Sequence, residues 1–401
     1  MINYLIIGGG PAGVSAAATL RRIHREGKIT LLSKEKVKPY AKMVLPYLLD
    51  DPARERDIFL PIPERVAVFL GREVTKIDVA NSRVVSSTRE TFPYDRLLIT
   101  SGAHPIKPKI KGGELPFVFT IRDLSDIQRM RARMNGKRGR AVIAGGGPVG
   151  LEVGDALHKL GFSITYVIGS DRIFSTSFDL ASSKFVEERL AKKGVEVRTG
   201  EDIVEVREEG EVVFKSQKTM KCDLVIFGKG VRPTINFLAE SGIKIKTGIV
   251  VDEHQETNVE GIYAAGDVAE TQDVVNGDWR VNSLWPVAVE QGKIAAFNIA
   301  SIKVPYMGSF SRNIMRVFGM SIFTAGMGQG EGSGIQCKKG RDFYHKIFLD
   351  KGILKGAIFI GELKRGGLYV NLMQQGIDVS RFPSSVLMGT FYPPHLFPRI
   401  L

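Results

Sequence analysis

One glycine pattern, present twice, most constrains how this chain folds. A short apolar run at residues 3–7 leads into Gly8-Gly-Gly10-Pro-Ala-Gly13, and a second run at 140–144 leads into Gly145-Gly-Gly147-Pro-Val-Gly150. The first glycine of such a pattern permits a tight turn, the second lets the backbone approach a pyrophosphate, and the third lets helix and strand pack closely. The chain is therefore predicted to bind two dinucleotides.

The residues around each glycine pattern complete the unit. Helical sequences over 14–25 and 151–160 follow the glycines, and further strands are expected over 28–32 and 162–168. This is the order of a dinucleotide-binding βαβ unit, in which the helix N-terminus faces the phosphates with its partial positive charge. Two glycine-rich turns in an α/β protein without nucleotides are the alternative, which the repeat of the whole unit disfavours.

Polar residues after other expected strands are candidate nucleotide ligands. Glu35 lies about 20 residues beyond the first glycine turn, where a carboxylate can accept the ribose hydroxyls of an adenosine. Ser33 is a rival, and a surface charge in a turn is the plain alternative for Glu35. Gly266-Asp267 also follows an expected strand. Its acid can accept ribose or ribityl hydroxyls, although the dipeptide is by itself a common turn.

The second unit does not choose between NADH and NADPH. Its second strand ends at Val167-Ile168-Gly-Ser170-Asp-Arg172. This end lacks the acid that usually accepts the ribose hydroxyls of NAD and repels a 2′-phosphate. Arg172 could pair with such a phosphate. Both nucleotides therefore stay open.

The bulk properties are typical of an α/β enzyme with two or three domains. The chain has 43% hydrophobic and 25% charged residues and a formal net charge of +13.

A basic protein suits a nucleic acid, an anionic membrane or an acidic partner. The densest basic run, from Arg129 to Arg140, follows Ser125-Asp-Ile-Gln128, which matches a capping box, so we interpret it as an exposed helix face. No nucleic-acid-binding module is recognisable, which makes that partner the least favoured.

The cysteines, histidines and apolar runs argue against a dithiol site, a metal site and a membrane span, respectively. Cys222 and Cys337 are the only cysteines and lie far apart, which fits a reducing cytoplasm and excludes a local dithiol. The six histidines are scattered, so no metal site is predicted. No apolar run approaches the roughly 20 residues of a membrane span, and Met1 to Gly8 runs straight into a strand. We expect no membrane span, no signal peptide and a cytoplasmic location.

Taken in order, these segments resemble one family. An expected antiparallel meander over 66–99 closes on Thr100-Ser-Gly102, between the two glycine units, and Gly266-Asp267 follows the second. This order resembles the pyridine nucleotide-disulfide oxidoreductases, over nearly the whole chain. The resemblance implies an α/β fold with two Rossmann-like, three-layer ββα dinucleotide-binding domains and a small α+β C-terminal domain. The implied domains are 1–115 with 245–310 for FAD, 116–244 for NAD(P)H and 311–401 for the C-terminal domain.

The same resemblance assigns the cofactors. The first glycine unit is expected to bind FAD and the second to bind NAD(P)H as co-substrate, while the Gly-Asp motif holds the flavin ribityl and phosphate region. The implied cofactor-binding residues are Gly8, Gly10, Pro11, Ala12, Gly13, Ser33, Glu35, Lys42, Val74, Thr100, Ser101, Gly102, Gly145, Gly147, Pro148, Val149, Gly150, Glu152, Arg172, Gly230, Gly266, Asp267, Pro286 and Ala288.

Further segments narrow the resemblance. Lys38-Pro-Tyr40-Ala-Lys42-Met-Val-Leu-Pro-Tyr47 resembles the Pro-Tyr-x-Arg segment of rubredoxin reductases and of the flavin module of assimilatory nitrite reductases. Residues 348–361 and 369–378 resemble their small C-terminal domain, which usually packs over the flavin region. Relatives that reduce disulfides or peroxides carry a Cys-x4-Cys pair or a cysteine near position 42, where this chain has Lys42 and Met43. Electron transfer without a cysteine relay is therefore implied.

Three residues are implied to act in catalysis: Lys42, Tyr47 and Glu152. Lys42 offers a positive charge to the FAD pyrophosphate in place of the family's arginine, without the planar fork of a guanidinium. Tyr47 lies where oxygenase-linked reductases often carry a lysine. Glu152 matches a glutamate that orients the nicotinamide carboxamide, although an acid favoured by the helix dipole explains it equally well. Trp285-Pro286, with Ala288, resembles a helix start whose N–H groups stabilise the reduced flavin.

The predicted function is that of an FAD-dependent NAD(P)H oxidoreductase. Hydride is expected to pass from the nicotinamide to flavin N5, and electrons then to a small acidic redox protein of the rubredoxin or ferredoxin type. An NAD(P)H oxidase that reduces oxygen directly is one alternative. A flavin-binding redox subunit or sensor of a larger complex is another. The sequence does not decide whether the chain forms a homodimer or joins a larger assembly.

Overall fold

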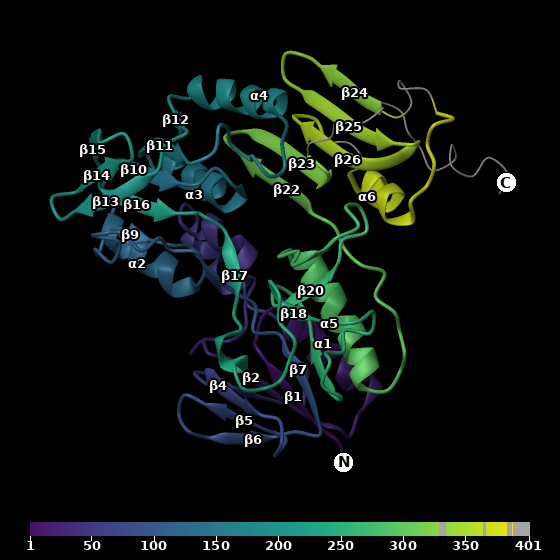
Figure 1. Cartoon of the computed structure of the whole chain (residues 1–401). Helices are drawn as coiled ribbons and strands as arrows, with labels where there is room; N and C mark the ends of the chain where they lie inside the picture. Colours follow the sequence, from purple (N-terminus) through teal and green to yellow (C-terminus); the bar gives the residue numbers. More distant parts are fainter. Residues whose placement is uncertain (329–333, 364–365, 383–386, 388–401) are drawn as a thin grey trace. The chain divides into compact units, whose positions relative to one another are not determined.

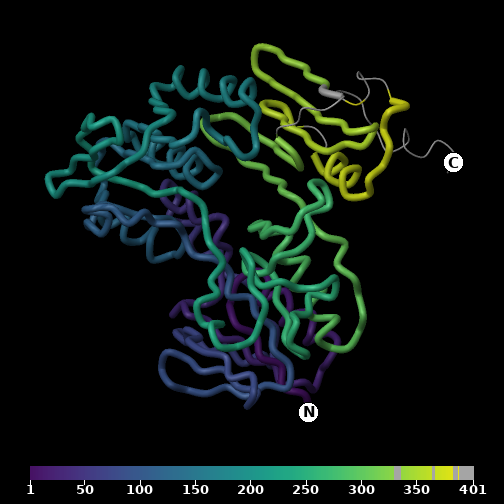
Figure 2. Tube along the Cα trace, in the orientation of Figure 1, coloured from purple at the N-terminus to yellow at the C-terminus, as the bar shows by residue number. Residues whose placement is uncertain are grey.

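The computed structural model describes residues 1–328, 334–363, 366–382 and 387, and the chain divides into two compact units. Helices and strands are labelled in Figure 1, and the colours along the trace in Figure 2 show the order of the segments. The first unit contains Met1–Lys107, Thr120–Asn135 and Lys229–Ser309. The second contains Pro108–Phe119, Gly136–Gly228 and the described residues from Phe310 onward. Each unit is built around a parallel sheet of its own.

The parallel sheet of the first unit has the strand order β19-β7-β1-β2-β3. Its strands are β1 (Asn3–Ile7), β2 (Lys28–Leu32), β3 (Val66–Phe69), β7 (Arg96–Ile99) and β19 (Ile262–Ala264). The last four residues of β1 and of β2 are all buried, as expected of strands covered on both faces. Their apolar runs therefore predict central strands.

Two different layers cover the faces of this sheet. Tyr4 and Ile6 pack with helices α1 (Pro11–Ile23) and α5 (Trp285–Ile299), whereas Leu5 and Ile7 pack on the opposite face. Small residues let α1 and α5 approach closely, and a Cβ at Gly292 would overlap the Ala12 carbonyl. The opposite face is covered by the antiparallel strands β4 (Val74–Asp78), β5 (Arg83–Ser86) and β6 (Thr91–Pro93).

The meander expected over 66–99 is correct only in its middle. Strands β4 to β6 are antiparallel, but β3 and β7 belong to the parallel sheet, where they pair with β2 and β1. Short alternating runs do not distinguish these roles, because pairing partners are chosen by the tertiary fold. The remaining elements of this unit are η1 (Lys42–Leu48), η2 (Pro52–Asp57), β8 (Ala103–Pro105), α2 (Leu124–Met134), β17 (Val231–Pro233), η3 (Asn236–Leu238), β18 (Ile249–Val250), β20 (Ala269–Gln272) and β21 (Trp279–Arg280).

Helix α2 begins earlier than the sequence predicts. Its N-cap is Asp123, and Asp126 accepts the Asp123 N–H at 3.0 Å, whereas the sequence suggested Ser125 with Gln128. The Asp126 carboxylate also accepts the Arg122 N–H at 3.0 Å. One acid thus satisfies two N–H groups just before the helix. The helix therefore begins two residues before the start that the sequence predicts.

The second unit repeats the architecture of the first. Its parallel sheet has the order β12-β11-β10-β16-β9, and the antiparallel strands β13, β14 and β15 pack on one face of it. Its elements are β9 (Val118–Phe119), β10 (Arg140–Ala144), α3 (Pro148–Lys159), β11 (Ser163–Ile168), α4 (Leu180–Ala191), β12 (Glu196–Thr199), β13 (Ile203–Arg207), β14 (Glu211–Phe214), β15 (Thr219–Lys221) and β16 (Leu224–Phe227).

A five-stranded antiparallel sheet near the C-terminus also belongs to the second unit. Its order is β22-β23-β26-β25-β24. The Phe318 N–H, in the turn between β22 and β23, donates to Asp155 of α3 at 2.7 Å, and Lys346 of β25 pairs with Asp179 at the start of α4. The elements are β22 (Arg312–Val317), β23 (Met320–Gly326), β24 (Gly334–Lys339), β25 (Tyr344–Asp350), β26 (Ile353–Ile360) and α6 (Gly366–Gln375).

The predicted fold class is confirmed. Both parallel sheets carry the glycine units, each with an antiparallel layer, and a small C-terminal sheet follows. The compact units follow packing, so residues 120–135 and 229–244 lie with the first unit although the sequence division placed them in the NAD(P)H domain. The assignment of nucleotides to domains remains a prediction. Within the residues described, no helix is both long and apolar enough to cross a bilayer.

Candidate functional site

Four of the predicted segments meet at one edge of the first sheet. Strands β1, β2, β7 and β19 are parallel and in register, with Ile7 beside Leu32 and Ile99, and Ile99 beside Ala264. Gly8, Ser33, Thr100 and the Gly266-Asp267 pair therefore follow at the same carboxyl edge. Ligands of open α/β sheets bind at this edge.

The first glycine turn is held from the side by Thr100. Its hydroxyl donates to the carbonyl oxygens of Ile7 at 2.9 Å and Gly8 at 3.0 Å. Gly8 has a φ of +111°, and a Cβ there would overlap the Thr100 carbonyl. A Cβ at Gly13 would overlap the Gly8 carbonyl. Both positions therefore require glycine for the fold itself.

Gly10 differs from Gly8 and Gly13 because its surroundings are open. A Cβ built on Gly10 would meet no described atom within 4 Å. Gly10 is the N-cap of α1, and in the described part of the chain no side chain caps this helix start, which carries Pro11 in its first turn. Uncapped N–H groups and a helix N-terminus form an anion site, so this cradle fits a pyrophosphate.

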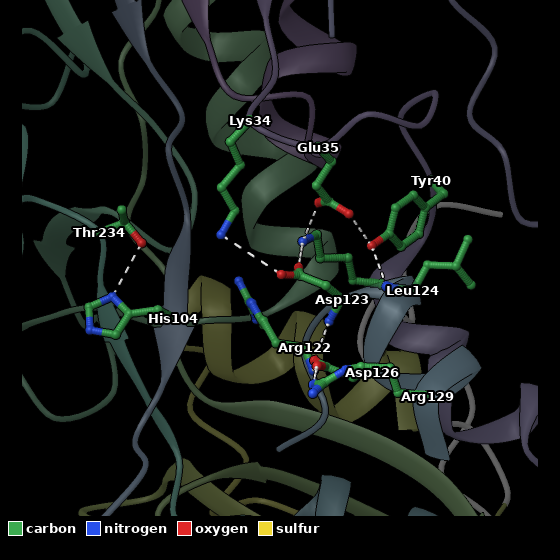
Figure 3. A network of polar contacts seen from close by, with 11 residues as sticks. Lys34, Glu35, Tyr40, His104, Arg122, Asp123, Leu124, Asp126, Arg129 and Thr234 are labelled. Atoms are coloured by element: carbon green, nitrogen blue, oxygen red, sulfur yellow. Dashed lines mark hydrogen bonds and ion pairs between the residues drawn. The ribbon is translucent and has the colours of Figure 1, made fainter. Parts of the chain in front are cut away.

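A charged network lies beside this edge (Figure 3). Lys42 pairs with Glu35 at 2.6 Å and with Asp123, and Lys34 lies 3.8 Å from Asp123. The Tyr40 hydroxyl donates to Glu35 and accepts the Leu124 N–H at 2.8 Å. Burial and the hydrogen bond to Glu35 raise the pKa of Tyr40 well above its ordinary value. Tyr40 thus remains a neutral donor that orients Glu35.

Arg122 and Asp267 form a second charge pair at 3.0 Å (Figure 3 shows Arg122). The Arg122 Nε is buried and has no hydrogen-bond partner among the described residues. Burial raises the pKa of the neighbouring Asp123, but Lys42, Lys34 and Arg122 outweigh it, so this pKa lies below its ordinary value. A half-buried guanidinium whose buried Nε is an unused donor, beside Asp267, fits an anionic ligand such as FAD.

Helix α5 brings its N-terminus to the same motif. Gln291, one of the most buried polar side chains, accepts the Gly266 N–H at 2.8 Å, and a Cβ at Gly266 would lie 3.0 Å from the Ala12 Cβ. The helix begins at Trp285, which is half-buried, with exposed Pro286 and buried Ala288 in its first turn. Among described side chains none caps its start, so the N–H groups there can face a ligand.

The other residues predicted for FAD lie in the first unit as well. Val74 begins β4 and is buried, and Tyr47 lies half-buried in η1. Ser101 donates its hydroxyl to the Thr234 carbonyl at 2.8 Å, and Gly102 accepts the Thr234 N–H at 2.9 Å. Gly230, predicted in the NAD(P)H domain, also lies in the first unit and accepts the Ile106 N–H at 2.9 Å. These contacts join the segments after β7 and β16.

The second glycine turn has the same construction. Gly145 has a φ of +126°, a Cβ there would overlap the Gly228 carbonyl, and one at Gly150 would lie 2.6 Å from the Gly145 carbonyl oxygen. A Cβ at Gly147 would meet no described atom within 4 Å. The described residues provide no side-chain cap for α3, which begins at Pro148 with exposed Val149. This cradle fits a second pyrophosphate.

Two further residues predicted for the second nucleotide site lie in α3 and after β11. Glu152 lies half-buried in the first turns of α3. Arg172 follows β11 and pairs with Asp171 at 2.6 Å, while donating to the carbonyl oxygens of Ser175 and Phe178 at 3.3 Å. Arg172 is therefore used to hold its own loop.

Both cysteines belong to the second unit. Cys222 is buried next to β16, and burial raises the pKa of its thiol to about 12, which keeps it protonated. Cys337 is exposed on β24. Neither cysteine lies next to Lys42 in the sequence, and no disulfide joins them.

Sequence reasoning missed three residues of the first site. Arg122 and Asp123 precede a basic helix, which directed attention to its exposed face, and Gln291 lies within a mostly apolar helix. Their roles depend on contacts with Asp267, Lys42 and Gly266, respectively. Of these contacts, only the acids at the start of α2, Asp123 and Asp126, can be recognised from the local sequence as a helix cap.

Comparison with known proteins identifies the family. The sequence pattern described as pyridine nucleotide-disulphide oxidoreductase matches residues 2–292, well over half of the chain. The chain belongs to this family. Its members are flavin-dependent NAD(P)H oxidoreductases, in agreement with the two cradles. The pattern of the rubredoxin NAD⁺ reductase C-terminal domain matches residues 312–377, which contain most of the C-terminal sheet.

Three curated relatives illustrate the range of this oxidoreductase family. The chain is 28% identical to nitrite reductase [NAD(P)H] of Bacillus subtilis over 94% of its length but only 48% of that protein's. It is 27% identical to the epsilon subunit of NADH-dependent phenylglyoxylate dehydrogenase of Aromatoleum evansii, over 96% of this chain and 95% of the subunit. It is 28% identical to rubredoxin-NAD⁺ reductase of Pseudomonas putida, over 75% and 80%.

Solved structures share the fold of this oxidoreductase. An NAD-dependent persulfide reductase from A. fulgidus has a TM-score of 0.87 at 26% identity, covering 94% of this chain and 77% of that one. Putidaredoxin reductase, in covalent complex with putidaredoxin, also has a TM-score of 0.87, at 23% identity and 94% coverage of both chains. The second likeness shows the fold alone.

Proposed function

We propose that this chain is an FAD-dependent NAD(P)H oxidoreductase that delivers electrons to a small redox protein of the rubredoxin or ferredoxin type. The observation that carries the proposal is the match of residues 312–377 to the C-terminal domain of rubredoxin reductases. Thiol-using relatives carry a cysteine near position 42, where this chain has Lys42 and Met43, and Lys42 pairs with Glu35 and Asp123. Electrons would therefore pass to the acceptor without a cysteine relay.

In this proposal the first unit binds FAD and sets its electrostatic surroundings. The α1 N-terminus at Gly10 would hold the pyrophosphate, and Lys42 and Arg122 would add positive charge. Glu35, oriented by Tyr40, would accept the ribose hydroxyls. FAD, when bound, supplies the redox chemistry by accepting a hydride at N5 and releasing electrons singly. The α5 N-terminus would favour negative charge on the bound ring.

The second unit would bind and orient the nicotinamide nucleotide. The α3 N-terminus at Gly147 would hold its pyrophosphate, and Glu152 would orient the carboxamide. Such positioning is the main contribution a protein makes to hydride transfer between cofactors, because no side chain needs to act as a general acid or base.

The test is anaerobic mixing of the purified, flavin-loaded protein with NADH and with NADPH, while the flavin absorbance is followed. We expect one or both nucleotides to bleach the flavin. A rubredoxin or ferredoxin added afterwards should restore its colour. Absence of bleaching with both nucleotides would refute the oxidoreductase proposal. Reoxidation by oxygen alone would replace it by an NAD(P)H oxidase.

A subunit of a larger oxidoreductase is the second candidate. The specific observation is the full-length likeness to the epsilon subunit of phenylglyoxylate dehydrogenase, which covers 95% of that subunit. In such an assembly a partner subunit would exchange electrons with the flavin. Bleaching by a nicotinamide nucleotide without reoxidation by rubredoxin, ferredoxin or oxygen would favour this candidate.

A further inference from the structure

NAD-binding units usually carry an acid near the end of this strand, and here the acid that follows β11, Asp171, is paired with Arg172 at 2.6 Å. β11 ends at Ile168, and the next residue, Gly169, lies about 20 residues after the third glycine of the pattern, where that acid is expected. Gly169 does not have a positive φ, so its backbone alone does not require glycine. A space limit beside Gly169 explains its identity better.

That space is taken by the carboxylate of Asp202. A Cβ built on Gly169 would lie 2.9 Å from Asp202 Oδ2 and 3.4 Å from Oδ1. Asp202 comes from a different element, the loop between β12 and β13. A carboxylate therefore occupies the place where the side chain of residue 169 would begin.

The loop that carries Asp202 is fastened to the end of β11. β11 and β12 are parallel, with Ile168 beside Thr199. The Gly200 N–H donates to the Ser170 carbonyl at 2.8 Å, and the Glu201 N–H donates to the Ile168 carbonyl at 3.1 Å. The Asp202 carbonyl accepts the Lys215 N–H at 2.8 Å. Asp202 is half-buried, and these contacts hold its backbone beside the end of β11.

The cation that could recruit a 2′-phosphate at this edge is already engaged. Arg172 pairs with Asp171 and donates to two backbone carbonyls, and its side chain is only 15% exposed. Arg198 of β12 is paired with Glu196 at 2.8 Å. Lys215, whose N–H donates to the Asp202 carbonyl, is exposed. Both arginines near this edge are thus engaged with acids of the protein itself.

We propose that Asp202 is the specificity-determining residue of the second nucleotide site and that it selects NADH over NADPH. It would accept the ribose hydroxyls of the adenosine, in place of an acid at position 169, and its charge would repel a 2′-phosphate. This inference rests on the proposed nucleotide site of the second unit. It assigns the nucleotide that the sequence leaves open.

The experiment compares wild-type protein with Asp202→Asn in two readouts. The first is kcat/KM for flavin reduction by NADH and NADPH, and the second is calorimetric binding of ADP-ribose and 2′-phospho-ADP-ribose to the same flavin-loaded protein. Because a hydrogen bond to a charged group is worth about tenfold or more in affinity, we expect the wild type to prefer NADH and ADP-ribose by at least about tenfold. Asp202→Asn should lose most of this preference.

Two further variants separate specificity from folding and from net charge. Glu209→Gln removes the same charge from the exposed turn between β13 and β14 and should leave the preference unchanged. Asp202→Gly combined with Gly169→Glu moves the acid to the usual position and should restore the preference for NADH. A merely structural role for Asp202 would not allow this rescue.

The outcomes distinguish this inference from the proposed function. Equal use of both nucleotides by the wild type, or a preference for NADPH, would overturn the role of Asp202 while leaving the oxidoreductase proposal intact. Failure of both nucleotides to reduce the flavin would refute the oxidoreductase proposal. In that event a retained preference for ADP-ribose, lost in Asp202→Asn, would still support the binding role.

Discussion

At the scale of single residues, the glycines of the two patterns differ in how much space surrounds them. Gly8, Gly13, Gly145 and Gly150 lie so close to backbone carbonyls that a side chain would disturb the fold. At Gly10 and Gly147 a Cβ would meet no described atom within 4 Å, so the fold itself does not exclude a side chain there. The sequence pattern alone does not distinguish these six glycines.

We therefore predict that Gly10→Val produces a folded protein that does not retain FAD. A Cβ at this position meets no described atom within 4 Å, so the added side chain should leave the fold intact and fill the space where the pyrophosphate would lie. Flavin absorbance after desalting measures retention, and circular dichroism measures folding. The matched control is Gly147→Val, which should retain FAD and lose reduction by NADH. Full flavin retention in Gly10→Val would show that the FAD site is placed wrongly.

Lys42 shows what a residue-level prediction leaves out. The sequence predicts a positive charge for the FAD pyrophosphate, and the structure adds two carboxylate partners, Glu35 and Asp123. Asp123 comes from a segment 81 residues further along the chain. Local sequence does not contain such a pairing, because it exists only after η1 and α2 have packed together.

At the scale of elements, the start of α2 links the helix to the charged network. Asp126 satisfies the Arg122 and Asp123 N–H groups, Tyr40 accepts the Leu124 N–H, and the Asp123 carboxylate pairs with Lys42. These contacts use the N-terminal groups that a helix leaves unsatisfied. The helix start and the candidate FAD site therefore support each other.

This link predicts a pH-dependent stability difference. The pKa of Asp123 is lower in the folded protein, so its charge stabilises the fold at neutral pH, and this contribution is lost as the pH falls below about 3.8 through the folded pKa. Asp123→Asn should lower the unfolding free energy by about 1–3 kcal/mol at pH 7. The difference should be smaller at pH 3 than at pH 7.

Urea unfolding at the two pH values measures this difference, at matched flavin content. Asp57→Asn is the control, because Asp57 is 68% exposed and its ion pair with Arg56 spans 3.6 Å. Exposed pairs of this kind contribute little, so the control should resemble the wild type. A difference for Asp123→Asn that is the same at both pH values would contradict the electrostatic explanation.

At the scale of the whole molecule, the net charge of +13 suits an acidic electron-transfer partner. We predict that kcat/KM with an acidic rubredoxin or ferredoxin decreases by about tenfold or more from low to high salt, because screening removes electrostatic steering. Steady-state rates at increasing salt measure this effect. With a small uncharged quinone as acceptor, the rate should change little. Equal salt dependence for both acceptors would argue against an acidic partner.

The C-terminal sheet is also understood only at this scale. Residues 312–377 match the C-terminal domain of rubredoxin NAD⁺ reductase, and contacts within the second unit join this sheet to α3 through Asp155 and to α4 through Lys346 and Asp179. Each contact spans more than 160 residues of sequence. The resemblance implies a small α+β domain here, but not which helices its sheet packs against.

The sequence by itself determined the two βαβ units and the family, because glycine turns and apolar strands are local signals with fixed spacing. It also located most residues at the two carboxyl edges. Only the tertiary structure decided that β3 and β7 join a parallel sheet, that Arg122 meets Asp267, and that Asp202 lies beside Gly169. These facts depend on register and on contacts between distant segments, which no local pattern encodes.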